Sequence, residues 1–290
     1  MTEIWPNFFV VGAIRSGTTS LYEYLRPIES IFLPSIKEPN YFSISIKHEL
    51  LTTPIRDTKK YLKLFQGVTD ETAIGESSPT YLWDPKAAKL IHQTVPDAKI
   101  IMILRNPVER SFSHYLMLIG NGSIEGSFED NIKKANKLDT SNFDGRIINA
   151  SFYYEQVKRY LELFPKEQLK IFIFEEFIKD TKKSVQDVLD FLEVDSPIPD
   201  NIQIVDNTFD LPVGNFSKYF IRNRILRSVV RELFPNDSAR NFRKLFRKSA
   251  KKPPMTDSER EFGEKLYFED SKKLENLLNI SLPWTFLNKK

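Results

Sequence analysis

The stretch FFVVGAIRSGTTSLYEYL, Phe8 to Leu25, decides the fold of this chain. Its first five residues, FFVVG, are a continuous apolar run, which is typical of a strand buried on both faces of a sheet. From Thr18 onward the apolar residues recur with helical spacing. Between the two segments, Gly12 and Gly17 have the spacing of the G-x-x-x-x-G-K-[ST] phosphate-binding loop. The stretch therefore predicts a strand, an anion-binding glycine loop and a helix.

The loop departs from that pattern at the position of its lysine. Thr18 replaces the lysine, Thr19 keeps the hydroxyl position, and Arg15 is the only cation in the loop. Backbone amides and the N-terminus of the following helix can still bind an anion. The loop lacks the point charge that a triphosphate and its metal ion require. A purely structural strand–helix turn is the alternative interpretation.

Apolar runs and helix-period segments alternate along the rest of the chain. Further strands are expected at 72–75, 99–104 and 169–174, and helices at 85–94, 107–118, 152–163 and 184–192. This alternation predicts an α/β fold, with a P-loop-type central parallel sheet flanked by helices on both faces. We expect a single domain over residues 1–290, with a basic helical C-terminal part at about 215–290. Residues 121–149, rich in Gly, Asn, Ser and Asp, are expected to form a long loop or lid with at most one short helix.

The composition excludes several classes of function. The chain has 290 residues, 41% of them hydrophobic and 28% charged, which is ordinary for a globular protein. It has no cysteine, so disulfides and thiolate chemistry are excluded, and its three histidines are scattered. The net charge of +3 is too small to indicate nucleic-acid binding. The N-terminus has no basic signal-peptide region, and no apolar run has the length of a membrane span. We expect a cytoplasmic location.

Positive charge is concentrated in the segment 218–252. It holds twelve Lys or Arg residues against two acids, Glu232 and Asp237. Ile221, Ile225, Val229 and Leu233 recur every fourth residue, which predicts a helix with an apolar stripe beneath the cations. A helix packed on the core with a solvated outer face is the simplest interpretation. A basic wall facing an anionic substrate and a contact with anionic lipid headgroups are the alternatives.

A second motif follows the strand expected at 99–104. In IIMILRNPVERSFSHY, Arg105 begins an R-N-P sequence, and Ser113 lies eight residues after it. GAIRSGTTSL resembles the 5′-phosphosulfate loop of sulfotransferases that use 3′-phosphoadenosine 5′-phosphosulfate (PAPS), and the R-N-P motif with its serine resembles their 3′-phosphate site. The two motifs lie roughly ninety residues apart, as in the carbohydrate branch that includes the heparan sulfate enzymes. The resemblance is clear over the first 115 residues and looser afterwards.

The position of Arg105 agrees with this resemblance. The residue follows a strand, and open α/β sheets bind ligands at the carboxyl ends of their strands. A planar guanidinium can hold a phosphate monoester through two hydrogen bonds. Ser113 would lie two turns into the following helix. The alternative for Arg105 is a surface ion pair with Glu109.

The resemblance implies a donor site with PAPS as donor, 3′,5′-bisphosphoadenosine as product and no metal. It assigns the 5′-phosphosulfate to the residues Arg15, Ser16, Gly17, Thr18, Thr19 and Ser20. Arg15 matches a position where relatives usually have lysine, but arginine cannot act as a proton donor. Lys251 and Lys252 resemble a basic loop that closes over the donor's phosphates, with plain surface charge as the alternative.

The resemblance also indicates a catalytic base in LPSIKEPNYF. Glu38 matches a glutamate that accepts the acceptor's proton in the carbohydrate branch, and Lys37 beside it either contacts the sulfonate or is solvated. The catalytic candidates are therefore Glu38, Arg15 and Lys37, although Glu38 also fits a surface loop carboxylate. Glu76 in GESSPTYL is a second base candidate, in a motif where relatives often carry a lysine and this chain has serines. For His114 a packed or exposed histidine is favoured over an acceptor contact.

These features predict direct in-line transfer of a sulfuryl group to a hydroxyl or amine of a carbohydrate, glycolipid or small-molecule acceptor. One alternative is a P-loop kinase, based on the glycine spacing. The other is a non-enzymatic binder of polyanions or membrane surfaces that uses the segment 218–252. The acceptor is expected to be a glycan, glycolipid or other hydroxylated molecule and not a nucleic acid, and the sequence leaves open both peripheral membrane contact and the oligomeric state.

Overall fold

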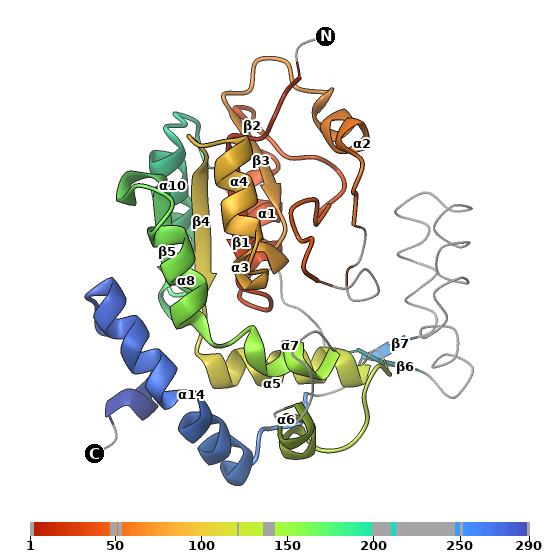
Figure 1. Ribbon diagram of the computed structural model, residues 1–290, viewed down its shortest axis with the longest axis vertical. Coiled ribbons are helices and arrows are strands. Elements are labelled where there is room, and N and C mark those ends of the chain that lie inside the picture. Colours follow the sequence, from red (N-terminus) through yellow and green to blue (C-terminus); the bar gives the residue numbers. More distant parts are fainter. Residues whose placement is uncertain are drawn as a thin grey trace.

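A five-stranded parallel sheet forms the centre of the molecule (Figure 1). The computed structural model describes residues 3–46, 51, 54–120, 122–135, 143–198, 210–212, 247–249 and 252–288. The strand order is β2-β3-β1-β4-β5, and every neighbouring pair is parallel. The strands are β1 (Phe8–Gly12), β2 (Ile31–Phe32), β3 (Ala73–Ser77), β4 (Lys99–Leu104) and β5 (Leu169–Ile173). The predicted parallel sheet is confirmed.

Helices follow most of the strands, as the alternation of the sequence predicts. They are α1 (Thr18–Leu25), α2 (Thr58–Leu62), α3 (Thr80–Trp83), α4 (Ala87–Thr94), α5 (Pro107–Gly120), α6 (Phe128–Ala135), α7 (Phe143–Asn149), α8 (Tyr153–Leu161), α9 (Phe174–Phe177), α10 (Thr181–Leu192) and α14 (Asp257–Leu278). Short 3-10 turns cover Lys63–Phe65, Lys166–Gln168 and Thr285–Asn288, and β6 (Asp210–Pro212) pairs antiparallel with β7 (Arg247–Ser249).

The central strands supply two hydrophobic cores, one on each face of the sheet. Phe8 and Val10 of β1 belong to the core covered by α1 and α10, whereas Phe9 and Val11 belong to the core covered by α3, α4 and α8. Side chains of a strand alternate between the faces, so a strand buried on both sides must be apolar at every position. This requirement explains the FFVVG and KIIMIL runs. It also explains why helices cover both faces, as predicted.

Gly75 permits the close packing of β3 against β1. Phe8 lies opposite Gly75 in the sheet, and a Cβ at position 75 would lie 2.0 Å from Cζ of the Phe8 ring. Gly75→Ala is therefore expected to lower the free energy of unfolding by about 2 kcal/mol, since the buried ring must move. Urea denaturation measures the change. The exposed Gly67 is the matched control, because the nearest atom to its added Cβ lies at 3.3 Å. Equal losses in the two variants would contradict this account.

The expectation of a long loop at 121–149 is wrong, because α6 and α7 lie in this segment. Ser127 begins α6 as a side-chain cap: its Oγ accepts from the backbone N of Asp130 at 3.1 Å and donates to that carboxylate at 2.6 Å. Phe128 and Ile132 lie one turn apart and are buried. The capping serine and the apolar pair are both visible in SFEDNI. The turn-forming residues around them nevertheless favoured the prediction of a loop.

Other differences concern the edge of the sheet and the C-terminal part. The two-residue strand β2 was not expected, and α14 ends at Leu278 because Asn279 turns left-handed with φ 53°. Trp284 lies beyond the end of α14, and its ring centroid is 6.2 Å from that of Tyr153. Lys251 and most of the basic segment 218–252, including its apolar stripe, lie outside the described residues. No helix in the described ranges combines the length and the apolar character needed to cross a membrane.

Candidate active site

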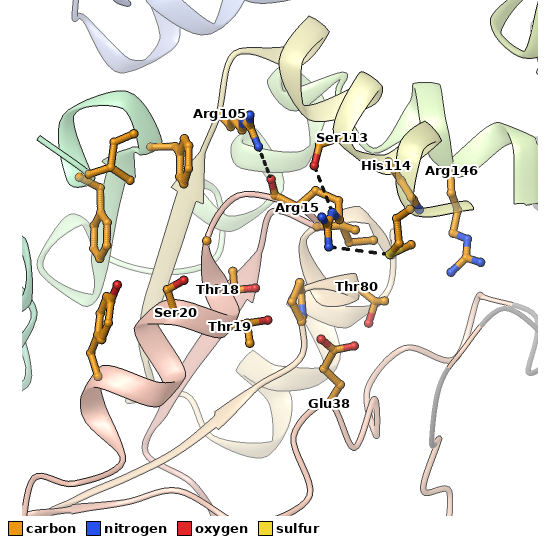
Figure 2. Close-up of a pocket in the computed structure, with 18 of the residues that line it drawn as sticks. Arg15, Thr18, Thr19, Ser20, Glu38, Thr80, Arg105, Ser113, His114 and Arg146 are labelled. Atoms are coloured by element: carbon orange, nitrogen blue, oxygen red, sulfur yellow. Dashed lines mark hydrogen bonds between the residues drawn. The ribbon is translucent and has the colours of Figure 1, made fainter. Parts of the chain in front are cut away.

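A pocket of about 460 Å³ lies at the carboxyl ends of the central strands (Figure 2). Its wall includes the loop after β1, the start of α1, the end of β4, and residues of α5 and α7. This is the place where open α/β sheets bind ligands. The pocket brings together most of the site residues expected from the sequence: Arg15, Gly17, Thr18, Thr19, Ser20, Glu38, Arg105, Ser113 and Lys252.

The glycine loop presents the N-terminus of α1 to this pocket. Gly17 has φ 85°, a left-handed conformation that glycine adopts without strain, and α1 begins directly after it. An added Cβ at Gly17 would lie 3.0 Å from the Phe174 ring. Thr18, Thr19 and Ser20 therefore start the helix at the pocket wall, where its amides favour an anion. Ser16 is fully buried and does not line the pocket.

Arg15 reaches from the loop to α5. Its Nε donates to Ser113 Oγ at 3.3 Å, and its NH1 lies 3.8 Å from the sulfur of Met117. Burial and the neighbouring charge of Arg105 lower the pKa of Arg15 to about 10. The guanidinium thus stays charged at neutral pH. It is a cation that is already partly desolvated and fixed beside the anion site.

Arg105 lies at the end of β4 and faces the same pocket. Its guanidinium stacks over Phe174, 4.8 Å from the ring centroid, and its NH1 donates to the backbone oxygen of Arg15 at 3.3 Å. The alternative, an ion pair with Glu109, is not formed, because that carboxylate pairs with Arg260 at 2.7 Å. The predicted pair of Arg105 and Ser113 is therefore found in one pocket, with the arginine held by an aromatic ring.

The R-N-P motif also builds the start of α5. Asn106 Oδ1 accepts from the backbone N of Val108 at 3.0 Å, and the Asn106 backbone N donates to Glu175 Oε1 at 2.9 Å. The other oxygen of Glu175 accepts from the indole nitrogen of Trp284 at 3.3 Å. Asn106 is thus connected through Glu175 to α9 and to the C-terminal segment. No sequence motif indicated this contact of Glu175.

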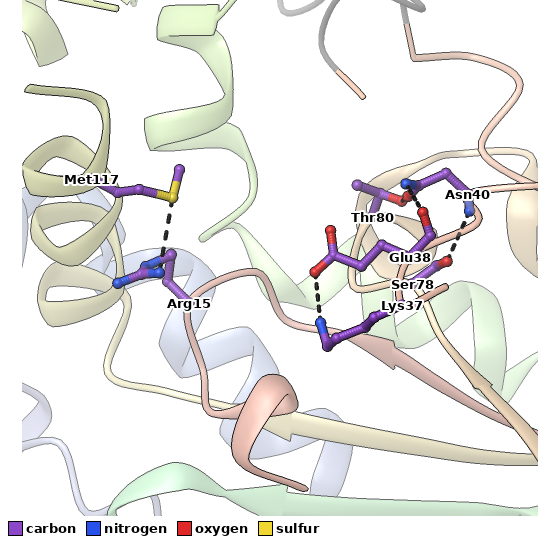
Figure 3. A network of polar contacts seen from close by, with 7 residues as sticks. All are labelled: Arg15, Lys37, Glu38, Asn40, Ser78, Thr80 and Met117. Carbon is purple, nitrogen blue, oxygen red and sulfur yellow. Dashed lines mark hydrogen bonds and ion pairs between the residues drawn. The ribbon is translucent and has the colours of Figure 1, made fainter. Parts of the chain in front are cut away.

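Glu38 projects into the pocket from the loop after β2. The carboxylate is 30% exposed, and its Oε1 lies 2.6 Å from Nζ of Lys37 (Figure 3). The negative charge of Glu38 raises the pKa of Arg15. Burial lowers that pKa by more, so the net shift is downward. Lys37 is not among the residues that line the pocket, and its role at the sulfonate stays a prediction.

The comparisons with known proteins identify the family. A family model described as the sulfotransferase domain matches residues 6–267. The chain belongs to the sulfotransferase family. Mouse carbohydrate sulfotransferase 15 is 27% identical over 248 residues, which cover 65% of this chain and 44% of that protein. The expected membership of the sulfotransferase family is confirmed, and the chain spans less than half the length of this carbohydrate sulfotransferase.

Solved sulfotransferase structures share this fold. A sulfotransferase from Alicyclobacillus acidocaldarius is 29% identical and superposes with a TM-score of 0.72, over 99% of this chain and 100% of that one. Mouse sulfotransferase SULT7A1 complexed with PAP is 17% identical, with a TM-score of 0.51 over 92% of this chain and 84% of that one. The P-loop-type fold of the sulfotransferases is thus confirmed. The kinase and non-enzymatic interpretations are not favoured by these matches.

Within the sulfotransferase fold, the second base candidate does not reach the pocket. Glu76 is fully buried, its Oε2 accepts from the Tyr61 hydroxyl at 2.5 Å, and it does not line the pocket. Complete burial raises the pKa of Glu76 to about 7. The interpretation of Glu76 as a base is therefore corrected: its position at the end of β3 directs it into the core beneath the site.

His114 and Arg146 lie on the remaining side of the pocket. Burial and the charges of Arg110 and Arg146 hold the pKa of His114 well below its usual range, so the ring is neutral. Arg110 NH1 lies 3.2 Å from His114 Nδ1, and Arg110 NH2 donates to the backbone oxygen of Arg146 at 3.4 Å. Burial lowers the pKa of Arg146 to about 10, against the raising effect of Glu38. Sequence reasoning missed Arg146 because α7 was taken for a loop.

Proposed function

We propose that this protein transfers a sulfuryl group from PAPS to a hydroxyl or amine of a sugar-bearing acceptor. The observation that carries the proposal is one pocket with two cationic anion sites. The first is the start of α1 with Arg15. The second consists of Arg105 and Ser113, which line the same pocket and each contact Arg15. A molecule with a phosphosulfate and a separate phosphate matches both. Family membership supports the same donor.

We assign the adenine to the apolar side of the pocket. Phe174, Phe177 and Ile178 line that side, together with Tyr24 of α1. The Phe174 ring lies between the glycine loop and the guanidinium of Arg105, so it borders both anion sites. Aromatic rings bind nucleobases by stacking, with little dependence on the identity of the base. The arrangement supports a nucleotide donor with phosphates at both ends of its ribose.

The proposed reaction is a single displacement at sulfur. The acceptor oxygen or nitrogen attacks the sulfur, and the bond between the sulfur and the 5′-phosphate oxygen breaks. The electron pair leaves with 3′,5′-bisphosphoadenosine, and Glu38 takes the acceptor's proton. Arg15 stabilises the charge on the leaving phosphate but keeps its own proton. By analogy with phosphoryl transfer, positioning and electrostatics supply the rate enhancement.

The acceptor is proposed from the relatives rather than from the site. The match to carbohydrate sulfotransferase 15 supports a glycan acceptor. A glycolipid acceptor and a peripheral membrane contact through the segment 218–252 stay predictions, as does the cytoplasmic location. The expected lack of a metal requirement is also a prediction. A screen of glycan, glycolipid and phenolic acceptors with labelled PAPS would identify the class that accepts the sulfuryl group.

Calorimetry with 3′,5′-bisphosphoadenosine tests the donor assignment. In the presence of a metal chelator, we expect binding with a Kd in the micromolar range or below, equivalent to about −8 kcal/mol or better. Adenosine 5′-monophosphate is the matched control, since it lacks the phosphate that Arg105 would hold. ATP with magnesium represents the kinase alternative. Tighter binding of magnesium–ATP than of the bisphosphate would contradict the proposed function.

A further inference from the structure

We propose that Asn40 is a positioning residue for Glu38, and that Ser78 and Thr80 fix Asn40 in turn. The inference rests on the proposed function, in which Glu38 accepts the acceptor's proton. It gives a role to the segment GESSPTYL, whose glutamate does not reach the pocket. Asn40 lies two residues after Glu38 and is fully buried. Its side chain connects the loop of the base to the start of α3.

Every polar group of Asn40 has a partner, and Figure 3 shows its contacts with Glu38, Ser78 and Thr80. Its backbone N donates to Ser78 Oγ at 3.0 Å, and its side-chain oxygen accepts from Thr80 Oγ1 at 2.6 Å. Its side-chain nitrogen donates to the backbone oxygen of Glu38 at 2.6 Å. Its backbone oxygen accepts from NH1 of Arg56 at 2.6 Å. Buried polar groups that are all hydrogen-bonded define a single arrangement, because any shift leaves one of them unsatisfied.

The backbone beside Glu38 is in an unusual conformation. Glu38 has φ 62° and Asn40 has φ 53°, on either side of Pro39. Asparagine enters this left-handed region more readily than most residues, whereas a glutamate there is strained. Such a conformation persists only where its surroundings hold it. Two of its hydrogen bonds hold the Glu38 backbone: the backbone N donates to the Ser77 oxygen at 3.1 Å, and the backbone oxygen accepts from the Asn40 side chain at 2.6 Å.

This conformation determines where the carboxylate lies. Among the described residues that line the pocket, Glu38 carries the one carboxylate. A general base must lie within hydrogen-bond reach of the proton it removes. A misplacement of about 1 Å can lower the rate by about a hundredfold. Asn40 therefore acts on the reaction through the backbone of Glu38, and we expect its loss to lower kcat rather than donor affinity.

Three variants test this role. Asn40→Ala is expected to lower kcat at saturating PAPS by up to about a hundredfold, with the Kd for 3′,5′-bisphosphoadenosine changed less than about twofold. Ser78→Ala removes the acceptor of the Asn40 backbone N but keeps both side-chain hydrogen bonds of Asn40, so we expect a smaller fall in the same direction. Asn40→Gly keeps the left-handed backbone but lacks the side-chain amide. Its kcat should lie between that of Asn40→Ala and that of the native protein. Native kcat in Asn40→Gly would overturn the role of the amide.

A double-mutant cycle with Glu38→Gln separates positioning from general structural damage. If Asn40 acts through Glu38, adding Asn40→Ala to Glu38→Gln lowers the residual rate less than about twofold, because coupled residues are not additive. The inference would be overturned if Asn40→Ala lowered the rate as much in the Glu38→Gln variant as in the native protein. It would also be overturned if Asn40→Ala reduced bisphosphate affinity as much as kcat. Should Asn40→Ala not fold, Asn40→Gly and Ser78→Ala complete the same cycle. A native protein that neither binds the bisphosphate nor transfers sulfuryl groups would instead refute the proposed function, and the inference with it.

Discussion

Glu38→Gln is expected to lower kcat about a thousandfold, within the range that general base catalysis contributes. Glutamine keeps the size of the side chain but cannot accept the acceptor's proton. The carboxylate projects into the pocket from a loop held in a defined conformation. The expected loss is therefore chemical rather than conformational. Glu38→Ala should abolish measurable transfer for the same reason.

Binding of 3′,5′-bisphosphoadenosine should survive in both Glu38 variants, because neither anion site includes this side chain. Calorimetry measures that affinity, and single-turnover transfer with labelled PAPS measures the chemical step. Glu23→Gln is the matched control, since Glu23 is exposed on α1 and does not line the pocket. Retained turnover in Glu38→Gln would remove this residue from the base role. A parallel loss of bisphosphate binding would instead indicate a disturbed pocket.

The central sheet and the pocket at its carboxyl edge were predictable because their signals are local. A strand buried on both faces must be apolar throughout, and a glycine loop must stand between that strand and its helix. The strands Phe8–Gly12 and Lys99–Leu104 and the helix Thr18–Leu25 have the expected bounds. Arg105 and Ser113 meet the glycine loop because adjacent parallel strands end at the same edge. The order of strands β1 and β4 makes them neighbours.

The rest of the site depends on contacts between distant segments, which a single sequence does not specify. Asn40 is hydrogen-bonded to Ser78 and Thr80, which lie 38 and 40 residues further along the chain, and nothing in the loop sequence indicates those partners. Arg146 lines the pocket from α7, a helix that was not predicted because the segment around it is rich in polar residues. Glu76 lies in a motif that suggested a catalytic base. The side chains of β3 alternate between the two faces of the sheet, however, and this alternation places the Glu76 side chain in the core. Local chemistry predicted the residue types, and tertiary packing decided which of them line the pocket.

Arg105→Ala is the second variant with a large expected effect, a fall of about a hundredfold or more in affinity for 3′,5′-bisphosphoadenosine. Hydrogen bonds to charged groups contribute about 1.5–3 kcal/mol each, and a guanidinium can make two to one phosphate. Burial lowers the pKa of Arg105, so part of its desolvation has occurred before the ligand arrives. Stacking on Phe174 fixes the guanidinium plane.

The selectivity of that loss decides the assignment. Adenosine 5′-phosphosulfate lacks the 3′-phosphate, so its affinity should fall much less in Arg105→Ala than that of the bisphosphate. Arg105→Lys keeps a positive charge without the planar fork, and we expect an intermediate loss. Arg260→Ala is the matched control, because it removes a nearby guanidinium that pairs with Glu109 outside the pocket. Equal losses for the two ligands would mean that Arg105 supports the pocket as a whole and does not read the 3′-phosphate.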